Sequence, residues 1–95
     1  MYVVEVKNYH SGNTGVSGWL NKWKKFHGMK PTDSVTCKRC NTNEAEHGGH
    51  VIMTDGNDKR RYIVPLCAHC NELKDEKPFL VNKDMLALAS DIKDL

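Results

Sequence analysis

The sequence has no long apolar run, and this absence limits what the chain can be. Hydrophobic residues make up 39% of the 95 residues, but no stretch approaches the roughly 20 consecutive apolar residues of a membrane helix. The N-terminal segment MYVVEVKNYH has no basic stretch followed by a long apolar core, so it does not read as a secretory signal. We therefore expect a cytoplasmic protein of one domain, residues 1–95, with no membrane partner.

A strong excess of charge of one sign is also missing, because the formal net charge is only +2. The distribution is uneven, since acidic residues gather toward the C-terminus and basic residues lie upstream. Such basic runs either keep a protein soluble or face a polyanion. If the partner is nucleic acid, the expected contacts are Lys38, Arg39, Lys59, Arg60 and Arg61.

Cysteine is limited to four residues, which form two Cys-x2-Cys pairs. Cys37 and Cys40 are separated from Cys67 and Cys70 by 26 residues. A tetrahedral zinc ion takes four thiolate or imidazole ligands, and two such pairs are typical of a closed structural zinc site. Thiol–disulfide redox chemistry is the alternative, but its usual βαβ context is missing. The sequence therefore predicts structural Zn²⁺ held by these four cysteines.

Apolar spacing and turn residues predict a small α+β fold. We expect an N-terminal strand and an amphipathic helix within 1–34, a zinc-binding core over 35–75, and a C-terminal helix within 76–95. The core would comprise a Cys-x2-Cys knuckle, a β-hairpin of strands 50–54 and 60–66, and a helix over 68–75. That order defines a treble clef, here stapled by zinc. The expected buried residues of the first and last helices are Trp19, Leu20, Trp23 and Phe26, and Met85, Leu86, Leu88, Ala89 and Ile92.

Residues 35–75 resemble the HNH-type nuclease superfamily, also called ββα-metal nucleases, as an atypical member. The residues that carry the resemblance are the two cysteine pairs, His50 in GGHV, Asn71 directly after Cys70, and Lys74. The resemblance implies that His50 would be a general base and Asn71 a helix-borne ligand of a second, catalytic divalent cation. Small HNH proteins are also encoded by phage and other mobile elements.

Two positions depart from the HNH pattern. Gly49 stands where a metal-binding side chain is expected before the histidine, and Tyr62 stands where an orienting asparagine is expected. These departures favour a nucleic-acid-binding module, with DNA preferred to RNA, or a protein-binding module, in either case without an intact hydrolytic site. The alternative is a metal-dependent DNA endonuclease with His50 as its base.

Overall fold

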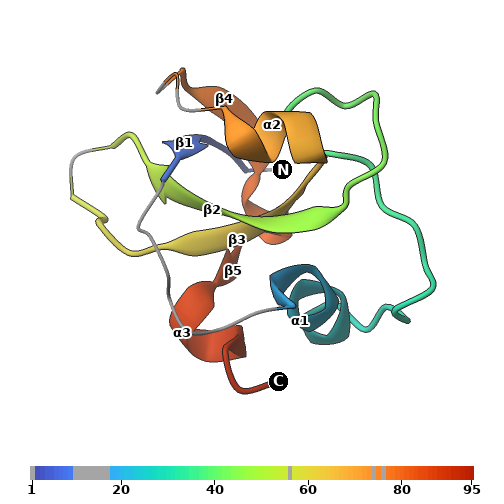
Figure 1. Cartoon of the computed structure of the whole chain (residues 1–95). Coiled ribbons are helices and arrows are strands. Elements are labelled where there is room, and N and C mark those ends of the chain that lie inside the picture. The colour runs from blue at the N-terminus through green and yellow to red at the C-terminus, as the bar shows by residue number, and fades with distance from the viewer. Residues whose placement is uncertain (1, 10–17, 56, 74, 76) are drawn as a thin grey trace.

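The fold is built on one curled antiparallel sheet, seen in a computed structural model that describes residues 2–9, 18–55, 57–73, 75 and 77–95. Five strands run in the order β4-β1-β2-β3-β5. The central pair, β2 and β3, forms a hairpin (Figure 1), which confirms the predicted hairpin with an earlier start for its first strand. The strands are β1 Val3–Asn8, β2 His47–Met53, β3 Tyr62–Leu66, β4 Phe79–Asn82 and β5 Ala87–Leu88.

The helices are short, and within the described ranges none has the length and apolar character needed to cross a membrane. Helix α2 lies on one side of the β2–β3 hairpin, and α1 and α3 lie on the other (Figure 1). The helices are α1 Trp19–Phe26, α2 Ala68–Glu72 and α3 Ala89–Ile92, with a 3-10 turn, η1, at Lys83–Met85.

The sheet separates two apolar layers, because successive side chains of a strand point to opposite faces. Val51, Val64 and Leu66 face the layer that contains the cysteine pairs. Ile63 faces the second layer, where it packs with Trp23 of α1. The cysteines and α1 therefore lie on opposite sides of the sheet.

Helix α1 buries Trp23 and partly buries Trp19 and Leu20, along the apolar face that its spacing predicted. Trp23 is 2% exposed, and its indole N–H donates to the carbonyl oxygen of Met85 at 2.8 Å. The prediction was wrong for Phe26, which is 51% exposed. Phe26 is the last helical residue, and its ring meets the edge of His27 instead of entering the sheet core.

The C-terminal segment does not form the single helix that its apolar spacing predicted. β4 pairs with β1 along Phe79–Asn82, and β5 pairs with β3. Within residues 77–95, only Ala89–Ile92 is α-helical. Leu86, Ala87 and Ile92 are buried nonetheless. Backbone pairing with the open edges of β1 and β3 outweighs the helical preference of this segment, since tertiary contacts routinely override local propensity.

Candidate metal centre

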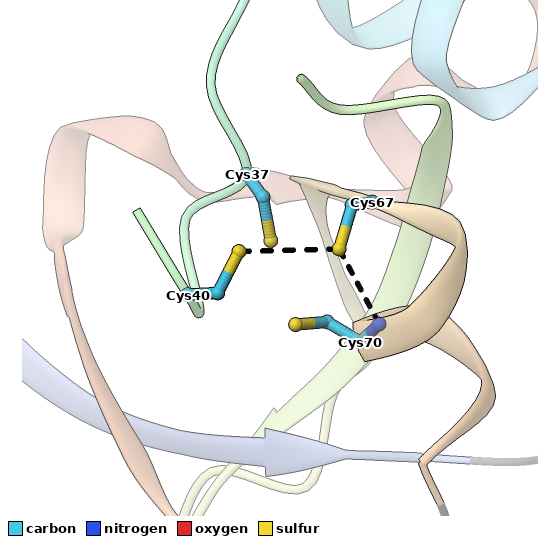
Figure 2. A group of neighbouring side chains, drawn as sticks. All are labelled: Cys37, Cys40, Cys67 and Cys70. Atoms are coloured by element: carbon cyan, nitrogen blue, oxygen red, sulfur yellow. Dashed lines mark hydrogen bonds between the residues drawn. The ribbon is translucent and has the colours of Figure 1, made fainter. Parts of the chain in front are cut away.

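The four cysteines converge on one point (Figure 2), with all four Sγ atoms within 4.8 Å of one another. The Sγ atoms of Cys40 and Cys67 are 3.9 Å apart. Four sulfurs placed tetrahedrally at about 2.3 Å from a zinc ion would be separated by about 3.8 Å. Three of the cysteines are buried and Cys40 is partly buried. The described cysteines could therefore hold a metal ion without rearrangement of the backbone.

The first cysteine pair sits in a tight turn before β2. The Cys37 amide donates to the carbonyl oxygen of Asn43 at 2.8 Å and closes the turn. Asn41 has φ +57°, a left-handed conformation that asparagine tolerates better than most residues. The amide of Arg39 points at Cys37 Sγ, 3.4 Å away. The turn thus aims a backbone N–H group at the Cys37 sulfur.

The second pair is positioned by the start of α2. Cys67 is the N-cap residue, and its sulfur accepts from the amide of Cys70 at 3.5 Å. The side-chain amide of Asn43 approaches the same sulfur at 3.9 Å. The Lys38 amide donates to Pro65 O at 2.9 Å and docks the first turn onto β3. These bonds bring the two pairs together across the 26 residues between them.

The surroundings of Cys40, Cys67 and Cys70 shift the pKa values of their thiols in different directions. The amides of Asn43 and Thr42 lower the pKa of Cys40 to about 6. Burial raises the pKa of Cys67, but hydrogen bonds from Cys70 outweigh it and the net shift is downward. Burial raises the pKa of Cys70, and so do its bonds to Cys67 and Cys37. Four thiolates this close would repel one another, and a divalent cation bound among them would offset that repulsion.

Asn8 supports the cysteine cluster, although it belongs to no motif of the sequence. Its side-chain N–H groups donate to the carbonyl oxygens of Cys70 at 2.7 Å and Leu73 at 3.0 Å. These carbonyls belong to the end of α2, where the helix itself supplies no further N–H donors to them. Asn8 is 7% exposed and continues the inward side of β1 after Val6. A polar residue at an inward strand position was the signal that could have revealed it.

His50 and Asn71 are not brought together. The His50 ring packs edge-on against the ring of Trp19 on α1, with centroids 5.1 Å apart. Gly48, on the same face of β2, lies against the backbone of Trp19. Gly49, on the opposite face, lies against Asn71. The sheet therefore stands between the histidine expected to act as base and the asparagine expected to bind a catalytic metal.

Tyr62, at the position expected to orient the histidine, belongs to a separate polar cluster. Its hydroxyl donates to Asp58, which also accepts from the Arg60 guanidinium at 3.2 Å. Arg60, and then Tyr62, hold the pKa of Asp58 far below its usual range. Arg60, expected to contact nucleic acid, is thus paired within the loop that precedes β3.

The other predicted basic contacts fall into two groups. Arg39 pairs with Asp75 at 2.7 Å, with side chains only 11% and 27% exposed, and lies over the ring of Phe79. Lys38 beside it is half-buried. In contrast, Lys59 and Arg61 are exposed in the loop that joins β2 to β3. Lys74, part of the HNH resemblance, lies outside the described residues.

Comparisons of the chain with models of known families, with curated proteins and with solved structures find no match. The function of the protein must therefore be inferred from its own residues.

Proposed function

We propose that the protein is a zinc-stapled treble clef that binds nucleic acid and does not hydrolyse it. The observation that carries the proposal is the convergence of the four cysteine Sγ atoms within 4.8 Å. Their turn, the β2–β3 hairpin and α2 follow one another in treble-clef order. Four thiolates in a closed shell suit zinc, and a zinc ion with four protein ligands has no position left for a reacting water.

The arrangement around β2 supports the absence of hydrolysis. HNH chemistry needs a base histidine and a metal-binding helix residue at one scissile phosphate. Here His50 faces α1, whereas Asn71 lies over Gly49 on the other side of the sheet. Any side chain at Gly49 would enter space held by Leu66 and Asn71. A second divalent cation would therefore lack both of its expected protein ligands beside the base.

The proposed nucleic-acid partner is supported by exposed cations at the loop end of the β2–β3 hairpin. Lys59 and Arg61 project there, close to Lys7 of β1. Cations of this kind bind mainly phosphates, so affinity should fall steeply as salt is added. The HNH resemblance of the core favours DNA over RNA.

The test combines metal analysis, binding and cleavage on one purified preparation. We expect equimolar zinc, salt-sensitive DNA binding, and no plasmid nicking when magnesium, manganese or nickel is added. His50→Ala is the matched control for cleavage. Nicking that requires both the added metal and His50 would establish an endonuclease and overturn the proposal. Protein without zinc, or zinc-loaded protein that does not bind DNA, would also contradict it.

A further inference from the structure

Helix α1 covers one face of the β2–β3 hairpin at Gly48 and His50, and the same face is hollowed closer to the loop that joins the two strands. Lys7 of β1 and Ile52 of β2 are paired in register, so they share a face. Ile52 follows His50 by two residues, and Arg61 precedes Ile63 by two, so both continue the face that carries His50 and Ile63. With Tyr9 and Lys59 these side chains line a groove of about 520 Å³.

The groove combines cations with an accessible aromatic ring. Lys7, Lys59 and Arg61 contribute three positive charges to its walls. The Arg61 guanidinium lies 5.8 Å from the centre of the Tyr9 ring, and Tyr9 is 39% exposed. Ile52 supplies an apolar, half-buried part of the lining.

Two acidic residues also line the groove, and one of them is paired with a residue outside its lining. Asp58 is already paired with Arg60 and accepts the Tyr62 hydroxyl hydrogen bond, so its charge is offset locally. Asp55 is the other carboxylate of the lining. The pattern of cations around an aromatic and an apolar surface is complementary to a ligand with regularly spaced anions and flat, apolar rings.

We propose that this groove binds single-stranded nucleic acid, with one base stacked on Tyr9 and phosphates paired with Lys59 and Arg61. This inference rests on the proposed nucleic-acid function and assigns its site and the form of its ligand. A single strand fits because its bases can turn outward and stack on an aromatic side chain, whereas the base faces of a duplex are stacked on one another.

The experiment is fluorescence anisotropy of a labelled oligothymidylate of about 12 nucleotides, a length in the range that single-strand-binding folds cover. Zinc-loaded wild-type protein, Tyr9→Ala, Tyr9→Phe and Arg61→Gln are titrated over a series of salt concentrations. The matched control is Lys25→Gln, which removes an exposed cation from α1 outside the groove. Equal zinc content and unfolding midpoints establish that the variants fold.

We expect Tyr9→Ala to weaken binding about tenfold and Tyr9→Phe to retain it, because stacking needs the ring and not the hydroxyl. Arg61→Gln should weaken binding and reduce the salt slope by about 0.7, the value of one phosphate contact on a single strand. Lys25→Gln should behave as wild type. The duplex of the same sequence should bind more weakly than the single strand.

Two results would overturn the assignment, and they differ. If Tyr9→Ala and Arg61→Gln bind as tightly as wild type, or if wild-type protein prefers the duplex, the groove is not the binding site. The proposed nucleic-acid function would still stand. If wild-type protein binds neither the single strand nor the duplex, both the proposed function and the groove assignment are contradicted.

Discussion

The side-chain oxygen of Asn71 lies 2.9 Å from the point where a Cβ would stand on Gly49. The same point collides with the side chain of Leu66. A side chain at residue 49 would therefore force Leu66 or Asn71 to shift in the close packing between β2 and α2. At residue 49, where the HNH pattern expects a metal-binding side chain, the space is filled by the side chains of Leu66 and Asn71.

This packing predicts the result of introducing an acidic residue at position 49. Gly49→Asp should destabilise the zinc-loaded protein by about 1–3 kcal/mol, because a side chain must displace Leu66 and Asn71. It should confer no metal-dependent cleavage. Urea unfolding and plasmid nicking measure the two effects. In a double-mutant cycle, Leu66→Val should lessen the cost of Gly49→Ala by removing the clashing methyl group. Additive costs would contradict the packing account.

Asn8 is predicted to stabilise the metal centre from a distance in sequence. Asn8→Ala should cost about 1–3 kcal/mol, because the buried carbonyl of Cys70 loses its donor. Zinc should also be released more readily to a chelator, since the end of α2 is less firmly held. Unfolding in urea and competition with a colorimetric zinc chelator measure these effects. Asn21→Ala, an exposed substitution on α1, is the control and should change neither.

Arg39 and Arg61 were both expected to contact nucleic acid, but their substitutions should affect different properties. Arg61→Gln should weaken binding, whereas Arg39→Gln should lower stability. Arg39→Gln removes a partly buried ion pair with Asp75 and should lower stability by about 1 kcal/mol or more. Because that guanidinium is already paired, oligonucleotide affinity should not change. Asp75→Asn should reproduce the loss of stability. A weaker affinity with unchanged stability for Arg39→Gln would show that Arg39 faces the ligand instead.

His50 predicts how stability depends on pH. Burial, and then Arg61, lower the pKa of His50 below its ordinary value of 6.5. The unfolded chain therefore takes up this proton first, so the stability contributed by neutral His50 is complete above about pH 6.5 and is lost as pH falls through the folded pKa.

The measurement is urea unfolding of zinc-loaded wild-type and His50→Gln proteins between about pH 7.5 and pH 5.5, where histidine titrates. Wild-type protein should lose more stability on acidification than His50→Gln, which has no imidazole at this position. Loss of zinc at low pH affects both proteins and is removed by taking the difference. Parallel pH curves would contradict the assigned environment of His50.

The cysteine cluster could be predicted from the sequence, because each Cys-x2-Cys pair is a local pattern and two pairs suit one ion. The hairpin was also predictable from strand composition and a turn. The orientation of His50 was not, since it depends on which face of β2 is covered by α1. The C-terminal strands were missed for a similar reason. Phe79 and Val81 form a strand because they pair with the backbone of β1. The pairing cannot be predicted from residues 76–95 alone, since it depends on a strand far away in the sequence.

The order of the strands also has a consequence for biosynthesis. All four cysteines and the β2–β3 hairpin emerge from the ribosome before either β4 or β5, which close the two edges of the sheet. Metal capture can therefore precede completion of the sheet, and for that interval β1 and β3 expose unpaired edges. A released protein that ends at residue 78 would keep all four cysteines but leave the edges of β1 and β3 unpaired, so we expect it to retain zinc and yet to aggregate.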